Sequence, residues 1–116
     1  MLPVIWHEGV NSGRITPNDA VRLFSENSAR ILGLFPRKGR LDAGSDADIV
    51  VFDPRETWKI GIGNQHSRVG YTLYEGKEVL GRVRTVISRG KPVVHEGSFV
   101  GSPKHGKFLS TRAGRV

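Results

Sequence analysis

Apolar residues recur at helical spacing in the first third of the chain. Residues 2–12 are rich in apolar side chains, and this pattern predicts a short helix. A second helix is expected after Thr16, because Pro17 suits the first helical position and Asp19 stands three residues after the cap, as in a capping box. The second helix carries an apolar stripe formed by Ala20, Leu23, Phe24 and Ile31. Such a stripe must pack against another layer of the protein.

The helical pattern ends near Pro36. A last helical turn over residues 29–32 should stop at Gly33, because glycine readily adopts the left-handed conformation that ends helices. Beyond Pro36, glycines separate short runs of β-favouring residues, and these runs predict strands over residues 48–52, 72–74, 83–88 and 91–95. The last two strands should form a hairpin across Arg89 and Gly90.

The strand that begins at Asp48 has a distinct pattern. Its residues 49–52 are Ile, Val, Val and Phe, which are apolar without alternation. We therefore expect this strand to be buried on both faces, at the middle of its sheet. Asp53 and Pro54 should end it, because proline cannot continue a central ladder of hydrogen bonds.

The order of these elements predicts an α+β fold, with short N-terminal helices followed by a small β-sheet module. A chain of 116 residues suits one domain and is too short for a complete (β/α)8 barrel, which needs about 250 residues. We expect residues 1–36 to supply the helices and residues 37–101 the β module. Residues 102–116 should form a partly disordered C-terminal extension.

Composition limits the environment of the protein. Cysteine is absent, so the chain has neither disulfides nor thiolate metal ligands, and a reducing compartment is permitted. No apolar run approaches the roughly 20 residues of a membrane span, and the N-terminus lacks the basic-then-apolar order of a signal peptide. We therefore expect a cytoplasmic protein without a membrane partner.

The net charge of the chain is strongly positive. Eighteen lysines and arginines stand against 11 acidic residues, giving a formal charge of +7 that favours contact with anions. However, the basic residues are spread along the chain, and no nucleic-acid-binding motif accompanies them. We do not expect nucleic acid to be the main partner.

Residues of the types that carry chemistry do not form a recognisable site. The four histidines, His7, His66, His95 and His105, include no H-x-H pair, and a metal site must gather three or more ligands. The serines lack the G-x-S-x-G elbow of a nucleophile. Gly61-x-Gly63 lacks the third glycine of a dinucleotide loop. We assign no catalytic, cofactor-binding or metal-binding residue.

One further segment resembles a phosphate-binding loop only in part. Residues 101–107 match most of the G-x-x-x-x-G-K pattern. Phe108 then stands where a serine or threonine must hold magnesium, and the chain is too short beyond it for the helix that the loop requires. We therefore interpret this segment as an ordinary loop.

Three acids in the stretch GSDADIVVFD allow two interpretations. Asp46 and Asp48 lie two residues apart, so on an extended chain they share a face, as a pair of catalytic carboxylates would. The alternative is structural: a short acid after Gly44-Ser45 can bond nearby backbone amides and lead the chain into a strand that Asp53 closes. We favour the structural interpretation.

Several motifs together resemble a known family. KGRLDAGSDADIVVFDP, residues 38–54, is similar to the C-terminal signature of the amidohydrolase superfamily. The segments SENSARILGLFPRKG, QHSRVGYTLYEG and SRGKPVVHEGSFVG resemble its dihydropyrimidinase and D-hydantoinase branch. The resemblance runs from about Leu2 to Leu109. Gly70 departs from it, since relatives often carry Asp before the Tyr-x-Leu-Tyr-Glu-Gly run.

The resemblance implies an enzyme that hydrolyses the ring amide of hydantoins or dihydropyrimidines. In that family a barrel holds two divalent metals, usually zinc, bridged by a carbamylated lysine, and the ligands lie upstream of the region matched here. None of them can be assigned to this chain, so no cofactor is expected within it. Asp46, Asp48 and Asp53 match structural positions of the family signature.

Two hypotheses follow. In the first, the chain is the C-terminal segment of a cyclic amidohydrolase: its helices would be the last barrel helices, and its strands would be part of a composite β-sandwich beside a missing barrel. Such a segment should be inactive alone and should associate with itself or with the barrel portion, because it exposes apolar surface and open strand edges. In the second, it is a stand-alone basic β module that binds an anionic partner such as nucleic acid.

Overall fold

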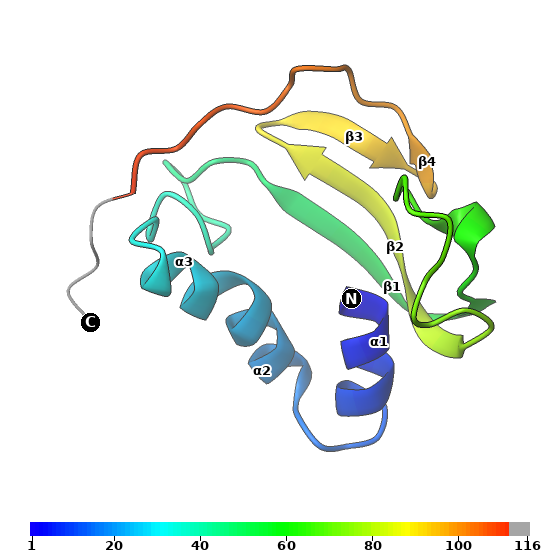
Figure 1. The fold of residues 1–116 in the computed structure, drawn as a ribbon. Helices are drawn as coiled ribbons and strands as arrows, with labels where there is room; N and C mark the ends of the chain where they lie inside the picture. Colours follow the sequence, from blue (N-terminus) through cyan, green and yellow to red (C-terminus); the bar gives the residue numbers. More distant parts are fainter. Residues whose placement is uncertain (112–116) are drawn as a thin grey trace.

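The N-terminal third of the chain forms two helical rods. The structure is a computed structural model and describes residues 1–111 (Figure 1). The first rod joins helix α1 (Leu2–Ile5) to the π-helical turn η1 (Trp6–Val10). The second rod runs through α2 (Pro17–Val21), the π-helical turn η2 (Arg22–Glu26) and α3 (Asn27–Ile31). Both helical segments were predicted from the spacing of their apolar residues.

Local signals in the sequence set the ends of the second rod. The Thr16 hydroxyl accepts a hydrogen bond from the Asp19 N–H (3.1 Å), and an Asp19 carboxylate oxygen accepts one from the Thr16 N–H (3.1 Å). This reciprocal pair satisfies two N–H groups that the first turn leaves without helical partners. At the other end Gly33 has a φ of 65°, which turns the chain out of the helix. The predicted capping box and the predicted end at Gly33 are confirmed.

Four antiparallel strands form one sheet in the order β1-β2-β3-β4. They are β1 (Ile49–Lys59), β2 (Glu78–Ser88), β3 (Lys91–His95) and β4 (Ser98–Phe99). The predicted hairpin is present: Arg89 and Gly90, with φ values of 48° and 77°, join β2 to β3 in a two-residue turn. Residues 72–74 are not a strand as predicted, because their hydrogen bonds close local turns from Thr72 to Glu75 and from Tyr74 to Lys77.

Strand β1 lies at an edge of the sheet, so the prediction of a central strand buried on both faces is wrong. Its ladder partner on one side is β2, and no strand among residues 1–111 pairs with its other side. Val50 is 49% exposed and Val51 is 48% exposed. The apolar run indicated that other elements bury both faces of this strand, and residues 1–111 do not bury them.

The prediction that Asp53 and Pro54 end the strand is also wrong. The chain continues as β1 to Lys59, and the register against β2 shifts between Val51 and Phe52 and again between Asp53 and Thr57. Such irregularities release a residue from the ladder, and an edge strand tolerates a missing N–H. Pro54 therefore sits in an interruption of the pairing.

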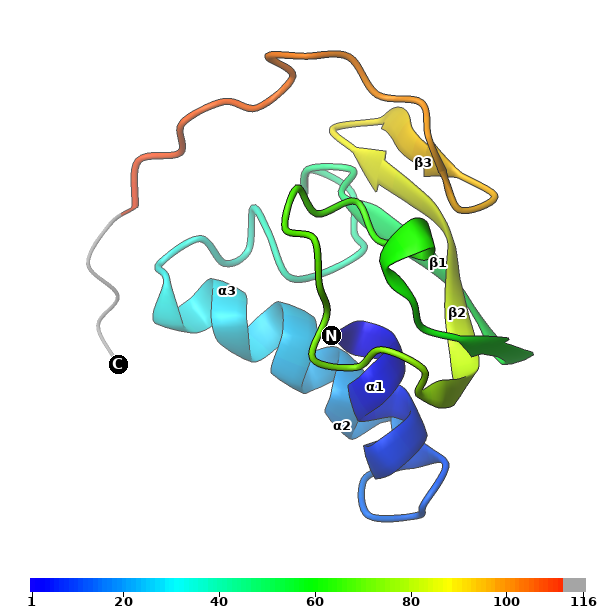
Figure 2. The same cartoon turned by 45° about the vertical axis from the view of Figure 1, so that its right-hand side comes forward.

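Helix α1 and η1 pack against the lower part of the sheet (Figures 1 and 2). The rings of Trp6 and Phe52 lie 4.9 Å apart, and both approach Gly81 closely. The Leu80 N–H donates a hydrogen bond to Nδ1 of His7 (3.0 Å). Val79, beside these residues on β2, is fully buried. Among residues 1–111, the other buried apolar residues are Ile60, directly after β1, and Ala20 and Ala29 on the second rod, so the buried core is small and divided.

The described residues therefore form an α+β fold, as predicted. Within residues 1–111, no helix is long and apolar enough to cross a membrane. The expected division at residues 36 and 101 remains a prediction, and the disorder expected near the C-terminus falls partly on residues 112–116, which lie outside the described residues.

Candidate functional site: an open apolar groove

A groove lies between the second helical rod and strand β1. Its volume is about 840 Å³. Apolar side chains from both layers make up most of its lining, including Leu2, Trp6, Phe24, Leu32, Val50 and Phe52. In two views the α2–α3 rod stands away from the sheet while α1 lies against it (Figures 1 and 2). Of the stripe predicted on the second helix, Ala20 and Phe24 line this groove, whereas Leu23 and Ile31 lie outside it and are exposed.

A cluster of charges forms part of the groove's lining. Lys38 lies 2.9 Å from a carboxylate oxygen of Asp46 and also pairs with Asp48. Arg37 lies 2.9 Å from the same oxygen of Asp46. The other oxygen of Asp48 accepts a hydrogen bond from the backbone N–H of Arg89 (2.8 Å). One lysine thus joins the two acids of the sequence motif, and the hairpin turn is tied to them.

The pairing shifts the pKa values of the cluster. The hydrogen bond from Lys38 is the main cause that lowers the pKa of Asp46, and Arg37 adds to it. For Asp48, burial acts to raise the pKa, but the hydrogen bonds from Lys38 and from the Arg89 N–H outweigh it and leave the pKa lowered. For Lys38, burial acts to lower the pKa, and the bonds to both acids outweigh that effect and raise it. All three groups are held in their charged forms.

These contacts tie the two acids to other parts of the chain, although not through the nearby backbone amides that were expected. The loop after α3 is fastened to the hairpin turn by the Asp48 bond and by the Gly90 N–H, which donates to the Ala47 carbonyl (2.9 Å). Asp53 lies outside the cluster and accepts a bond from the nearby Arg55 N–H (2.9 Å). Asp46 and Asp48 therefore hold the loop in place with their carboxylates already paired.

The four histidines do not lie close together in the structure. His7 bonds β2, His66 lies beside Phe99, His95 is in β3, and His105 lies near the carbonyl of Ser88. No group of three or more histidine or acidic residues within residues 1–111 could hold a metal ion. The two-metal site implied by the family resemblance therefore does not fit the residues described here.

The two glycine-rich segments take other conformations. Gly61 precedes the short 3-10 helix η3 (Ile62–Asn64), and its N–H donates a hydrogen bond to the side-chain oxygen of Asn64 (3.0 Å). Residues 101–111 form an extended strap over the β2–β3 turn (Figure 1). No helix follows Lys107 in the described chain, as a nucleotide loop would require.

Sequence reasoning missed a row of ion pairs on the sheet. Glu56 lies 2.7 Å from Arg82 and 3.0 Å from Arg84, and Arg84 continues to Glu96 at 2.8 Å. The two arginines stand two apart on β2, so they share a face, and this spacing was the available signal. The bulge at residues 53–57 brings Glu56 to them, which the sequence did not reveal.

Comparisons with known proteins agree on one family. The model of the amidohydrolase family matches residues 3–93. A D-hydantoinase from Ralstonia pickettii is 45% identical over 91% of this chain, and a dihydropyrimidinase from Rattus norvegicus is 42% identical over 93%. The chain spans 23% and 21% of those two relatives, or roughly a quarter or less of their length.

Solved structures give the same result. A D-hydantoinase structure superposes on 98% of this chain with a TM-score of 0.93 and 42% identity, and the match covers 25% of that structure. An L-hydantoinase from Arthrobacter aurescens superposes on 86% of the chain with a TM-score of 0.81 and 31% identity. The helical rods, the four-stranded sheet and the matched sequence point to the same assignment: the chain belongs to the amidohydrolase family.

Proposed function

We propose that this chain serves as the C-terminal structural part of a cyclic amidohydrolase of the hydantoinase and dihydropyrimidinase kind, which hydrolyses a cyclic amide C–N bond. The observation that carries the proposal is the match of nearly the whole chain to a quarter or less of such relatives, at 42–45% identity. The open groove also supports the proposal. Apolar surface of this extent is normally covered by another layer of secondary structure, which the rest of such an enzyme would supply.

The proposal assigns no catalytic role to residues 1–111. The three acids of the motif, Asp46, Asp48 and Asp53, are paired with cations or with backbone N–H groups, and the four histidines are dispersed. The two divalent metals that the family resemblance implies would therefore be held by residues outside the described part. The chain by itself should bind no stoichiometric zinc and should not hydrolyse hydantoin or dihydrouracil.

The apolar groove and the free edge of β1 are the proposed contact with the barrel portion of the enzyme. Val50 lines the groove and is half exposed, so burying it against another layer would stabilise the assembly by about 1 kcal/mol. The unpaired edge of β1 offers backbone groups to a further strand. Without that portion, the same surface should drive association of one copy with another.

Reconstitution tests this function. The chain is mixed or co-expressed with a D-hydantoinase from Ralstonia pickettii that lacks the segment matched here, and hydantoin hydrolysis is measured. We expect activity only when both pieces are present. Turnover by the purified chain alone, or no activity in the mixture despite two folded pieces, would contradict the proposal.

Two matched variants locate the contact. Val50→Asp places a charge in the groove, and Val69→Asp places one on a loop outside it; the two valines are 49% and 51% exposed. Because the groove would desolvate the new carboxylate, only Val50→Asp should reduce reconstitution, by about tenfold or more. Equal loss in both variants would show that the groove is not the contact.

A further inference from the structure

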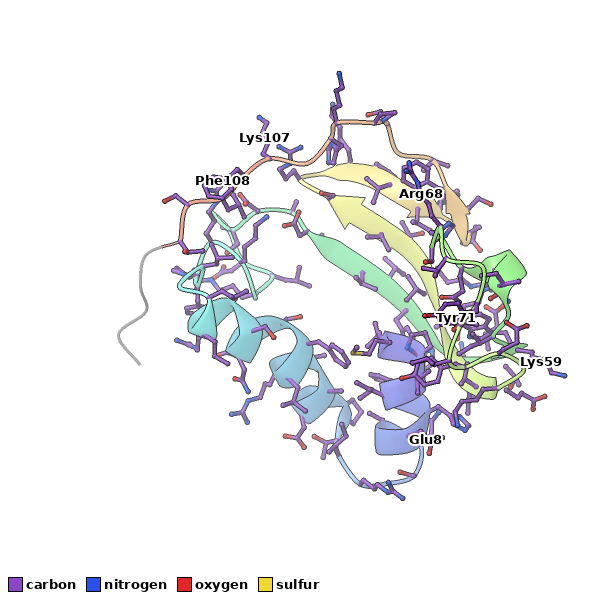
Figure 3. The ribbon with its side chains drawn as sticks, viewed as in Figure 1. Glu8, Lys59, Arg68, Tyr71, Lys107 and Phe108 are labelled. Atoms are coloured by element: carbon purple, nitrogen blue, oxygen red, sulfur yellow. The ribbon has the colours of Figure 1, made fainter. Side chains whose placement is uncertain are left out.

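A second, smaller pocket lies where the C-terminal strap, residues 101–111, crosses the β2–β3 turn. The guanidinium of Arg89 donates a hydrogen bond to the His105 carbonyl, and Nε2 of His105 lies 3.1 Å from the Ser88 carbonyl. These contacts hold the strap against the turn and leave a pocket of about 330 Å³ beneath it. Figure 3 shows Lys107 and Phe108 on the strap, at the opposite end of the molecule from Lys59 and Tyr71.

The pocket has an excess of positive charge. Its lining includes four cations, namely Arg37, Lys38, Arg89 and Lys107. Two of these, Arg37 and Lys38, pair with Asp46 and Asp48, which leaves two positive charges uncompensated. None of the ion pairs formed within residues 1–111 involves Arg89 or Lys107. A part-buried guanidinium such as Arg89 is more stable beside an anion.

The wall formed by the strap adds hydrogen-bond donors. Within residues 1–111, no backbone hydrogen bond has an N–H of residues 106–110 as its donor. The hydroxyl-bearing residues Ser88 and Ser110 also line the pocket. Guanidinium groups and free backbone N–H groups are the donors with which proteins hold carboxylates and phosphates.

We propose that this pocket binds a small oxyanion, a phosphate or carboxylate group, between the strap and the hairpin turn. The bound group would face the guanidinium of Arg89, the side chain of Arg37 and the N–H groups near Gly106. The site is not a nucleotide loop, because no helix follows Lys107 within residues 1–111 and a volume of about 330 Å³ suits a small ligand. The proposal is independent of the proposed amidohydrolase role.

The test is titration of the full chain with inorganic phosphate at constant ionic strength, followed by calorimetry and by the NMR shifts of the backbone amides. We expect saturable binding, with shifts concentrated at residues 88–89 and 106–110. A second titration with acetate shows whether a carboxylate occupies the same site. No saturation, or shifts spread over all basic surfaces, would overturn the proposal.

Matched variants separate a site from a general charge effect. Arg37→Gln removes a pocket cation, whereas Arg40→Gln removes an exposed arginine of the same loop that does not line the pocket; each arginine pairs with a nearby aspartate. Loss of one exposed ionic contact should weaken phosphate binding about fivefold for Arg37→Gln, with little change for Arg40→Gln. Lys107→Gln and Lys104→Gln form a second pair on the strap. Equal weakening within each pair would refute the site.

Discussion

Replacing Asp48 with alanine should loosen the attachment of the α3–β1 loop to the hairpin turn. The carboxylate makes two contacts that alanine removes, an ion pair with Lys38 and a hydrogen bond from the Arg89 N–H at 2.8 Å. A hydrogen bond to a charged acceptor contributes about 1.5 kcal/mol or somewhat more. The side chain of Asp48 is 36% exposed, so solvent reduces the ion pair to about 0.5 kcal/mol. We expect a loss of about 2 kcal/mol in the free energy of unfolding.

Urea denaturation at pH 7, followed by circular dichroism, measures this loss. Asp48→Asn keeps an acceptor for the Arg89 N–H and loses the charge, so it should cost about half as much as Asp48→Ala. Asp42→Ala is the control, because Asp42 lies in the same loop and its side chain is 58% exposed. If Asp48→Ala and Asp42→Ala both stay within about 0.5 kcal/mol of the wild type, the cluster does not hold the loop.

The pH dependence gives a second measurement of the same cluster. The pKa of Asp48 is lowered in the folded chain, so its contribution is fully present above the ordinary carboxyl pKa of 3.8 and is lost as the pH falls through the lower folded value. The stability difference between wild type and Asp48→Ala should therefore shrink below a pH of about 4. A difference that stayed constant down to pH 2 would refute this reasoning.

Three further predictions concern other parts of the molecule. Thr16→Ala removes the acceptor for the Asp19 N–H and should lower the free energy of unfolding by about 1 kcal/mol, as measured by urea denaturation. Gly81→Ala should cost about 3 kcal/mol, because φ is 120° and the new Cβ would lie 2.5 Å from Phe52. Gly70→Ala is its control, since open space surrounds Gly70; equal costs would contradict the clash. Binding of a fluorescent DNA duplex should be undetectable at about 0.15 M salt, and tight binding there would favour the basic-module hypothesis.

The sequence alone determined the features that depend on near neighbours. The capping box of Thr16 and Asp19 needs only residues three positions apart, and the Arg89–Gly90 turn needs only two residues that tolerate a positive φ. The family motifs are likewise contiguous, so the amidohydrolase relationship was visible before any contact was known. The structural interpretation of Asp46 and Asp48 rested on local turn chemistry, whereas their contacts are with the side chains of Arg37 and Lys38 and with the N–H of Arg89, which is 41 positions from Asp48.

Tertiary structure decided what depends on distant segments. An apolar run indicates that a strand is buried by other parts of a protein, but not where the strand lies in its sheet. Only the observed strand order showed that β1 is an edge strand, and the side chain of Val50 is half exposed. Residues 72–74 favour a strand locally, yet no strand in the described part of the chain pairs with them, and they close turns instead. The apolar groove is lined by residues about 50 positions apart in the sequence. Lys38 and the Arg89 turn, which line the smaller pocket together, are separated by a similar length of chain. Such contacts follow from the packing of whole elements, which no local pattern encodes.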